Sequence, residues 1–345
     1  MRILGIETSC DETSVSVVDF VRGRFAVRAN VVYSQIATHA KTGGVVPEVA
    51  AREHCLKIVP VLDKAVKKSG ASKKNVDAIA VTSGPGLITS LLVGVEAART
   101  LAAVWEKPLI PINHIEAHVA SNWLANEHIA FPAICLVVSG GHTELLLMKR
   151  QGSYECVGRT LDDAAGEAFD KVAKLLHLPY PGGPSISRAA VEGDAYLYKL
   201  PRPMLAKKNL DFSFAGMKTA VLYTVRGVPG HAPQKTRGPV SIPDMAASFQ
   251  QAAVDVLVGK TIRAAQQFKV RSVLLAGGVA ANMELRKQLV DAVVRELPCA
   301  TYFQPALEYC TDNAAMIAAR GVFAFQKKRA WPWKTVKADP NWETW

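Results

Sequence analysis

The stretch ILGIETSCDETSVSVVD, residues 3 to 19, has two apolar runs separated by a polar turn, which is the pattern of a β-hairpin. The stretch ICLVVSGGHTELLLMK, residues 134 to 149, repeats this layout about 130 residues later, with SGGHT as its turn. Small and polar turns let a backbone approach a ligand closely. Two similar hairpins, each opening one half of the chain, predict a duplicated architecture with two lobes.

The segments that follow the hairpins have an α/β pattern. VDAIAVTSGPGLITSLLVG, residues 76 to 94, predicts a strand, a glycine-proline turn and a helix. RSVLLAGGVAANMELRKQLVDAVVREL, residues 271 to 297, predicts the same order around Gly277 and Gly278. Such a turn before a helix suits a nucleotide, but it also joins many ordinary strands and helices, and both interpretations stay open.

Length and composition limit the class of protein. A chain of 345 residues is too long for one small core and favours two lobes. Glu7 and Asp11 interrupt the apolar N-terminus, so a secretory signal is not expected. The most apolar long window, residues 87 to 105, contains Glu96 and Arg99 and predicts a buried helix rather than a membrane span. Six scattered cysteines indicate buried, reduced thiols and a cytoplasmic protein.

The chain is basic, with a formal net charge of +11. Lysine and arginine that neutralise phosphates release bound counterions, so this charge favours a nucleic acid as partner. A basic surface that is only solvated is the alternative. The candidate contacts are the loop at 226–239, with Lys235 and Arg237, and the tail, with Lys327, Lys328 and Arg329.

The run NHIEAH, residues 113 to 118, contains two histidines four residues apart. On a helix His114 and His118 lie on one face and could share a metal ion, although most such pairs are ordinary surface or core residues. The zinc-peptidase motif H-E-x-x-H has its glutamate directly after the first histidine, whereas here Glu116 comes one residue later. It would lie about 160° around the helix from either histidine.

The segment LDDAAGEAFDKVAKLLHL, residues 161 to 178, predicts a helix with one apolar face. That face comprises Leu161, Ala165, Ala168, Val172 and Leu175. Asp170 falls on the opposite side, so the pattern alone predicts a solvated carboxylate. Further along, Ser241 and Asp244 have the spacing of a helix N-terminus.

Ten motifs occur in order along the chain: ETSCDET, GGVVPEVAAREH, GPGL, NHIEAH, VSGGHTELL, GRTLDDAAGEAFDK, YPGGPS, DFSFAGMKTAV, GGVAAN and CTDNAAMIAARG. Together they strongly resemble the bacterial type of the tRNA N6-adenosine threonylcarbamoyltransferase family, TsaD, whose members were long called O-sialoglycoprotein endopeptidases. The resemblance runs from Met1 to about Phe325 and leaves out the loop at 226–239 and the tryptophan-rich tail.

The resemblance implies an α/β fold of the actin-like, sugar-kinase-like type, with two lobes and a central cleft. The expected N-terminal lobe is 1–130, the C-terminal lobe 131–325 and the tail 326–345, with a helix at about 311–329 packed back on the first lobe. The implied enzyme transfers the threonylcarbamoyl group from threonylcarbamoyl-adenylate to N6 of the adenosine 3′ of the tRNA anticodon, releasing AMP. TsaB and TsaE are the implied partners, and no membrane is implied.

The resemblance also assigns site residues. His114, His118 and Asp312 match the ligands of one divalent metal ion; iron is favoured, and zinc accepts the same ligands. Asp11 and Glu12 match acidic residues near the reaction centre, as a base or as orienting groups. The donor-binding positions are Val137, Val138, Ser139, Gly140, Gly141, Asp170, Gly183 and Asn282. Ser187 departs from the family, because many bacterial relatives have an aspartate there that contacts the ribose.

Three other functions are set against this one. A metallopeptidase would use the His114 and His118 site, but it needs a general base that reaches metal-bound water. A small-molecule kinase would use the glycine turns to hold ATP. A tRNA-binding module without catalytic activity would explain the charge, but it leaves the metal and nucleotide motifs without a use.

Overall fold

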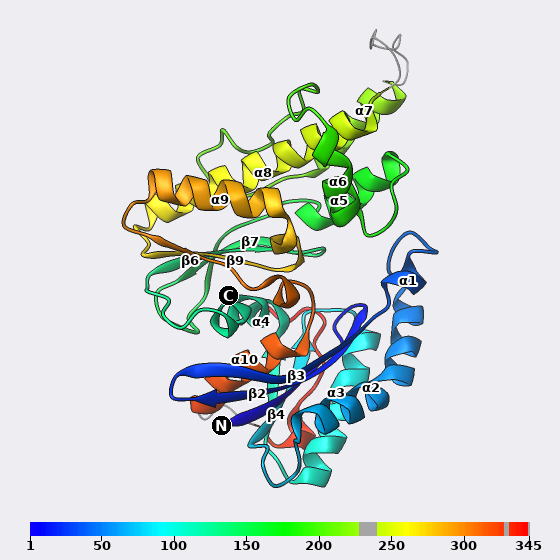
Figure 1. Cartoon of the computed structure of the whole chain (residues 1–345), viewed down its shortest axis with the longest axis vertical. Helices are drawn as coiled ribbons and strands as arrows, with labels where there is room; N and C mark the ends of the chain where they lie inside the picture. The colour runs from blue at the N-terminus through cyan, green and yellow to red at the C-terminus, as the bar shows by residue number, and fades with distance from the viewer. Residues whose placement is uncertain (228–239, 328–330, 344–345) are drawn as a thin grey trace. The chain divides into compact units, whose positions relative to one another are not determined.

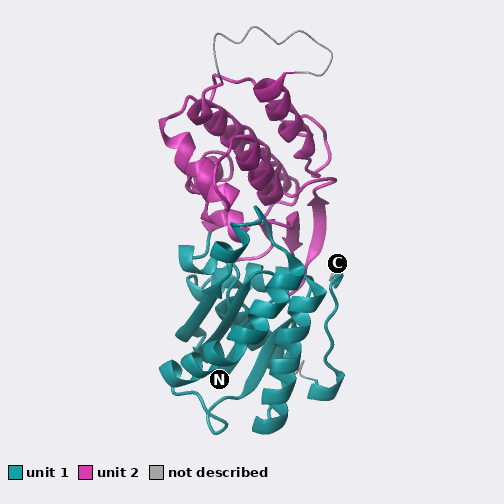
Figure 2. Cartoon of the chain, turned by 90° about the vertical axis from the view of Figure 1, so that its right-hand side faces the viewer, with its two compact units in different colours: residues 1–129, 304–345 teal, residues 130–303 magenta. Residues whose placement is uncertain are grey.

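The computed structural model describes residues 1–227, 240–327 and 331–343, which form two compact units (Figure 2). Unit 1 consists of Met1–Ile129 and Gln304–Trp345, and unit 2 of Ala130–Phe303. The lobes expected from the sequence end at residues 130 and 325. In the structure, the residues from 304 onward belong to unit 1 instead of the second lobe. Lys235, Arg237, Lys328, Arg329 and Trp345 lie outside the described residues.

Unit 1 contains a five-stranded sheet in the order β3-β2-β1-β4-β5. Figure 1 labels three of its strands, β2, β3 and β4. Its strands are β1 (Arg2–Glu7), β2 (Glu12–Val21), β3 (Arg24–Ser34), β4 (Ala78–Gly84) and β5 (Leu109–Asn113). β1 pairs antiparallel with β2, from Arg2 opposite Asp19 to Glu7 opposite Ser14, and this confirms the first hairpin. β4 and β5 continue the sheet in parallel with β1.

Helices cover both faces of this sheet because its central strands are apolar on both sides. Leu4 and Ile6 face the core under α2 (Pro47–Ser69) and α3 (Ile88–Trp105). Ile3, on the opposite face, packs in the core formed with α4 (His114–Ala120) and α10 (Ala314–Gln326). The short elements of the unit are α1 (Ile36–His39), η1 (Ser121–Leu124), η4 (Leu307–Tyr309) and η5 (Trp333–Thr335).

Unit 2 contains a second five-stranded sheet, in the order β10-β9-β6-β7-β8. Its strands are β6 (Ala133–Val138), β7 (Thr143–Met148), β8 (Glu155–Arg159), β9 (Ser272–Ala276) and β10 (Thr301–Phe303). Its helices are α5 (Ala165–Leu175), α6 (Gly182–Ala189), η2 (Ala190–Glu192), α7 (Ala215–Arg226), α8 (Ile242–Gln267), η3 (Gly278–Ala281) and α9 (Met283–Glu296). The buried α8 packs against β6, α6 and α9, and the Ser241 hydroxyl caps it by accepting from the Asp244 N–H, as the sequence predicts.

The two sheets have the same topology. In each, three consecutive strands form an antiparallel meander, and two later strands extend the sheet in parallel beyond the first strand of that meander. The order β3-β2-β1-β4-β5 therefore repeats as β8-β7-β6-β9-β10. The duplicated α/β architecture predicted from the two hairpins is confirmed.

Burial bears on two expectations from the sequence. Within the described residues, α3 is the one helix long and apolar enough to cross a membrane, yet its Leu91, Val95 and Ala98 lie in the core of unit 1.

All six cysteines are free thiols, as predicted, but Cys55 and Cys299 are exposed, so the prediction that the thiols are buried is wrong for these two. Cys55 lies on the exposed side of α2 and Cys299 in the loop between α9 and β10, and neither belongs to an apolar face.

Candidate metal centre and nucleotide-binding segments

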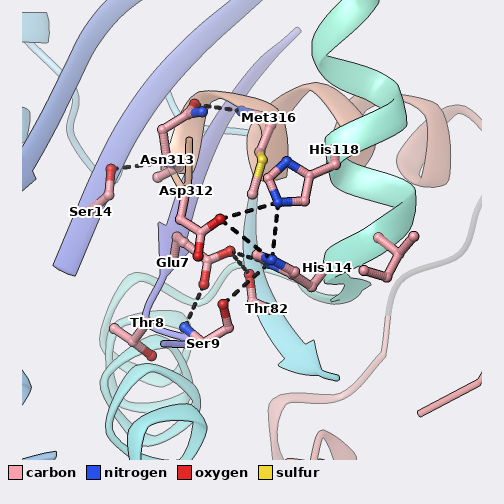
Figure 3. A network of polar contacts seen from close by, with 12 residues as sticks. Glu7, Thr8, Ser9, Ser14, Thr82, His114, His118, Asp312, Asn313 and Met316 are labelled. Atoms are coloured by element: carbon pink, nitrogen blue, oxygen red, sulfur yellow. Dashed lines mark hydrogen bonds and ion pairs between the residues drawn. The ribbon is translucent and has the colours of Figure 1, made fainter. Parts of the chain in front are cut away.

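The two histidines of NHIEAH are held by the start of α4. Asn113 ends β5, and its Oδ1 accepts hydrogen bonds from the N–H groups of Ile115 (2.9 Å) and Glu116 (3.1 Å). This side-chain cap starts the helix directly after the strand. His114 and His118 then lie one turn apart, with their Nε2 atoms 3.1 Å from each other (Figure 3).

Asp312 reaches the same point from the segment before α10. Its Oδ1 lies 3.1 Å from His118 Nε2 and 3.5 Å from His114 Nε2. Asn313 caps α10 by accepting from the Met316 N–H (3.1 Å), and the Ala314 N–H donates to Ser14 Oγ on β2 (2.9 Å). These bonds fix the carboxylate opposite the histidines, although about 200 residues separate it from them in the chain.

The three residues fit a divalent metal ion by donor type and by spacing. Two imidazole nitrogens and one carboxylate oxygen lie within 4.8 Å of one another. Tetrahedral ligands bound at about 2.0–2.1 Å would be about 3.3 Å apart. The observed separations of 3.1 to 3.5 Å agree with this value. Three protein ligands with positions left for substrate are typical of a catalytic site rather than a structural one.

Glu7, at the end of β1, orients His114. Its Oε2 lies 3.1 Å from His114 Nδ1 and accepts from Thr82 Oγ1 (2.7 Å), and its Oε1 accepts from the Ser9 N–H (2.5 Å). A carboxylate that accepts the Nδ1 proton leaves Nε2 free as a ligand atom. This role of Glu7 is not predicted from the sequence, where the residue counts only against a signal peptide. The available signal was a carboxylate at the end of an otherwise apolar strand.

The two histidines differ in their affinity for protons. Burial opposes a charge on His114, but Asp312 and Glu7 outweigh it and raise the pKa of His114 to about 9. Burial and the neighbouring His114 lower the pKa of His118, against the attraction of Asp312. Near neutral pH and without an ion, the pair therefore carries one positive charge, on His114, and His118 is neutral.

Glu12 is the first residue of β2 and Asp11 directly precedes it, in the same unit as the three candidate ligands. Burial, Asp11 and Asp312 raise the pKa of Glu12 well above its usual range. Ser34 Oγ donates to Glu12 Oε1 at 3.0 Å. Of the acidic pair predicted near the reaction centre, Glu12 therefore interacts electrostatically with both Asp11 and the predicted ligand Asp312.

Glu116 faces away from this centre, as the helical spacing predicts. It is buried, and its Oε2 accepts from Arg320 of α10 through Nε (2.6 Å) and Nη2 (2.5 Å). A glutamate held in a buried ion pair is not available to take a proton from metal-bound water. The arrangement does not favour the metallopeptidase.

The predicted donor-binding residues all lie in unit 2. Val137 and Val138 are buried at the end of β6, and Ser139, Gly140 and Gly141 form the turn before β7. The first turn of α5 abuts this turn, since the Gly166 N–H donates to Ser139 O at 3.2 Å. Side-chain atoms added at Gly140 or Gly141 would meet open space, so this backbone is accessible to a ligand.

Asp170 and Gly183 lie beside each other where α5 meets α6. The Gly182 N–H donates to Asp170 Oδ1 at 2.7 Å, and Asp170 is half-buried. The pattern alone predicted a solvated carboxylate, whereas Asp170 is half-buried because α6 packs against α5. Helix α5 also begins at Ala165, so Leu161 lies outside it and is exposed.

Asn282 has two functions in the fold. Its Oδ1 caps α9 by accepting from the Leu285 N–H (2.9 Å). Its Nδ2 donates to Ser187 Oγ on α6 (3.1 Å) and to Gln250 Oε1 on α8 (2.8 Å). Ser187, the departure from the family pattern, also donates to Gln250 Oε1 (2.8 Å). Gln250, which the sequence did not single out, thus links the two positions.

Comparison with known proteins gives the family. A model of the family TsaD, tRNA N6-adenosine threonylcarbamoyltransferase, matches residues 26–319. The protein of that name from Geobacillus thermodenitrificans is 52% identical over 330 residues, covering 95% of this chain and 93% of that protein. The one from Thermomicrobium roseum is 50% identical over 347 residues (95% and 93%), and the one from an Anaeromyxobacter species is 48% identical over 343 residues (99% of each).

Two solved structures are similar in fold. Full-length HypF in its phosphate- and nucleotide-bound form superposes with a TM-score of 0.57 at 13% identity, covering 96% of this chain and 47% of that chain. Component A of (R)-2-hydroxyglutaryl-CoA dehydratase from Acidaminococcus fermentans gives a TM-score of 0.53 at 12% identity, covering 95% and 98%. At such identities the similarity concerns the fold alone. It confirms the expected two-lobe, actin-like α/β class.

Proposed function

This chain belongs to the tRNA N6-adenosine threonylcarbamoyltransferase family, and from that premise we propose its reaction in detail. It transfers the threonylcarbamoyl group from threonylcarbamoyl-adenylate to N6 of the adenosine 3′ of the anticodon and releases AMP. The observation that carries the proposal is the convergence of His114, His118 and Asp312 in a chain about half identical to enzymes of this name.

We assign one divalent ion, iron in preference to zinc, to His114 Nε2, His118 Nε2 and the Asp312 carboxylate. Bound there, the ion supplies a Lewis acid that polarises and orients the donor's carbamoyl group. Glu7 holds the Nδ1 proton of His114, so that Nε2 presents its lone pair to the site. The caps at Asn113 and Asn313 hold the two helix ends from which the ligands project.

The transfer itself is an acyl substitution. The N6 amine attacks the carbamoyl carbon and forms a C–N bond, and the bond from that carbon to the phosphate oxygen breaks. The electron pair leaves with AMP, and the amine loses one proton. We propose that the carboxyl pair Asp11 and Glu12 accepts this proton, because Glu12 interacts electrostatically both with Asp11 and with the candidate ligand Asp312.

The nucleotide part of the donor binds to unit 2 in this proposal. The accessible backbone of Ser139, Gly140 and Gly141, next to the first turn of α5, suits a phosphate, since N–H groups of a turn and of a helix N-terminus attract anions. Asp170, Gly183 and Asn282 lie on or beside α5 and α6 and contact the nucleoside. Val137 and Val138 support the turn from β6.

We further propose that the acceptor is tRNA, that TsaB and TsaE assist the reaction, and that the enzyme works in the cytoplasm. The family supports tRNA directly, because its name specifies the acceptor. The net charge of +11 agrees with a polyanionic substrate.

The test is transfer of label from radioactive threonine into tRNA, with bicarbonate, ATP, the adenylate-forming enzyme and the partner proteins present. The wild-type chain should label tRNA, and His118→Ala should lose most of that activity while staying folded. The matched control is His128→Ala, the same change at an exposed histidine. Protein cleavage that chelators abolish, without label in tRNA, would instead establish the peptidase.

A further inference from the structure

The described part of the tail, residues 331–343, packs along unit 1 (Figure 2). Trp331 forms an antiparallel bridge with Leu109 on β5, with N–O distances of 2.9 and 3.4 Å. Val336 is 2% exposed and belongs to the core beneath α2 and α3, where Trp333 packs against it. The segment lies beyond residues 26–319 of the family match, and the proposed function gives it no role.

The segment ends in a β-turn that its sequence specifies. The Trp342 N–H donates to Asp339 O (3.3 Å), and the Asn341 N–H donates to Asp339 Oδ1 (3.0 Å). Aspartate at the first position and proline at the second are favoured in such turns, because the side chain accepts a backbone bond and the ring fixes φ. We call Asp339 to Trp342 the C-terminal turn.

The C-terminal turn contacts unit 1 through its backbone. The Asp339 N–H donates to Ser83 O (2.7 Å), and the Gly86 N–H donates to Pro340 O (3.3 Å). A Cβ atom at Gly84 would lie 1.8 Å from Asp339 O, so this close approach requires glycine. The glycine-proline turn that follows β4 is therefore shaped to receive the C-terminal turn.

Besides Glu7, two neighbours of His114 are linked to this turn, Asn113 directly and Ser9 through the loop at 84–87. The Asn113 Nδ2 donates to Trp342 O (3.0 Å), while the Oδ1 of the same side chain caps α4. On the other side the Leu87 N–H, next to Gly86, donates to Ser9 O (2.8 Å), and Ser9 Oγ lies 3.2 Å from His114 Nδ1.

We propose that the C-terminal turn is a positioning element for the metal centre. An amide side chain can cap a helix only when its oxygen faces the helix N–H groups, and the bond from Asn113 Nδ2 to Trp342 O holds it in that orientation. Asn113 precedes His114 directly, so the orientation of this cap sets where the first ligand projects. The turn acts through Asn113 and through the loop at 84–87, and it does not touch the ion.

The expected effect is smaller than that of a direct contact to a ligand. Partners hydrogen-bonded to metal ligands typically contribute about 10- to 100-fold to affinity, and the turn acts one bond further out, so we expect about fivefold. This inference rests on the metal centre of the proposed function. The test therefore measures metal binding itself, with Co²⁺ as the probe and its visible absorption as a report on ligand geometry.

Two changes remove the contact from opposite sides. A chain ending at residue 338 loses the turn but keeps Val336 and Trp333 in the core. Asn113→Asp keeps an oxygen that caps α4 and replaces the donor that faces Trp342 by an acceptor. The added negative charge affects Co²⁺ affinity equally in the full and in the shortened chain. The difference between the effects of Asn113→Asp in the two chains therefore measures the hydrogen bond from Asn113 to Trp342 alone. Lys337→Ala, at an exposed position of the same segment, is the control.

We expect the shortened chain to bind Co²⁺ about fivefold more weakly than the full chain, with an altered absorption spectrum. Asn113→Asp should reduce Co²⁺ affinity by a factor about fivefold larger in the full chain than in the shortened one. Wild-type Co²⁺ affinity in the shortened chain, or equal effects of Asn113→Asp in both backgrounds, would overturn the proposal. If the shortened chain does not fold, the full-length variant Asp339→Ala takes its place, because it loses the hydrogen bond from the Asn341 N–H that stabilises the turn. The expected and the contradicting Co²⁺ affinities are then the same as for the shortened chain. A wild-type chain that takes up no Co²⁺ would reject the metal centre as well, which separates the two failures.

Discussion

At the scale of single residues, the candidate centre includes a carboxylate outside its three candidate ligands. Glu7 is completely buried and accepts hydrogen bonds from a backbone N–H, a threonine hydroxyl and His114. Removing one of its oxygens would leave buried donors without an acceptor. The residue therefore serves both the stability of β1 and the orientation of the first ligand.

Glu7→Gln should lower metal affinity by about 10- to 100-fold, because an amide presents a donor to at least one of the three donors that Glu7 now accepts from. Competition with a chelator of known affinity measures the change. Glu48→Gln, the same substitution at an exposed position on α2, should leave metal binding at its wild-type level. Equal affinities in all three proteins would show that Glu7 does not orient His114.

Glu116→Gln should lower the stability of the protein and leave its metal binding unchanged. Breaking its buried ion pair with Arg320 should lower the free energy of unfolding by about 3 kcal/mol, because a buried guanidinium loses its counter-charge. Metal content should not change, since Glu116 faces away from the ligands. Denaturant unfolding and metal analysis of the same sample give both values. Loss of metal with unchanged stability would place Glu116 at the centre after all.

At the scale of elements, the sequence predicted those parts whose signal is local. Both hairpins and the helix carrying His114 and His118 could be predicted, because period and spacing specify them. β3 and β8 were not predicted: β3 is a partly exposed edge strand, so its sequence lacks a continuous apolar run. The half-burial of Asp170 could not be predicted either, because it depends on packing by α6, a separate element.

His54, on helix α2, contacts Cys10 and Thr13 where the chain enters β2. This contact should make stability depend on pH. The buried ring lies 3.0 Å from Cys10 O and 2.8 Å from Thr13 Oγ1. Burial lowers the pKa of His54 below its unfolded value. Its contribution to stability is therefore complete above about pH 6.5 and is lost as the pH falls toward the folded-state pKa.

The wild-type free energy of unfolding should then fall between about pH 7 and 5, with His54 contributing up to about 1.4 kcal/mol for each pH unit in that window. His54→Gln should show a smaller decrease over the same range. His118, whose pKa is also lowered, is present in both proteins, so the difference between their curves isolates His54. Parallel curves would mean that His54 is protonated equally in the folded and unfolded chain.

At the scale of the whole molecule, the formal net charge follows directly from composition. With a net charge of +11, the isolated chain should bind tRNA with an affinity that falls linearly with salt concentration on logarithmic axes. Filter binding over a salt series measures the slope. Neutralising Lys235 and Arg237 together should reduce it by about one unit for each phosphate that the protein no longer binds. A flat response would mean that other proteins supply the tRNA contacts.

The order in which the chain is synthesised matters for the metal centre, because unit 2 interrupts unit 1. His114 and His118 leave the ribosome before unit 2, and Asp312 only after it. At typical rates the 130–303 stretch takes roughly 9 to 35 s to emerge. During that time the histidines lack their third ligand, and α10 has not yet packed against β1. A chain terminated before Asp312 therefore lacks one of the three candidate ligands, and the complete ligand set exists only once unit 2 has been synthesised.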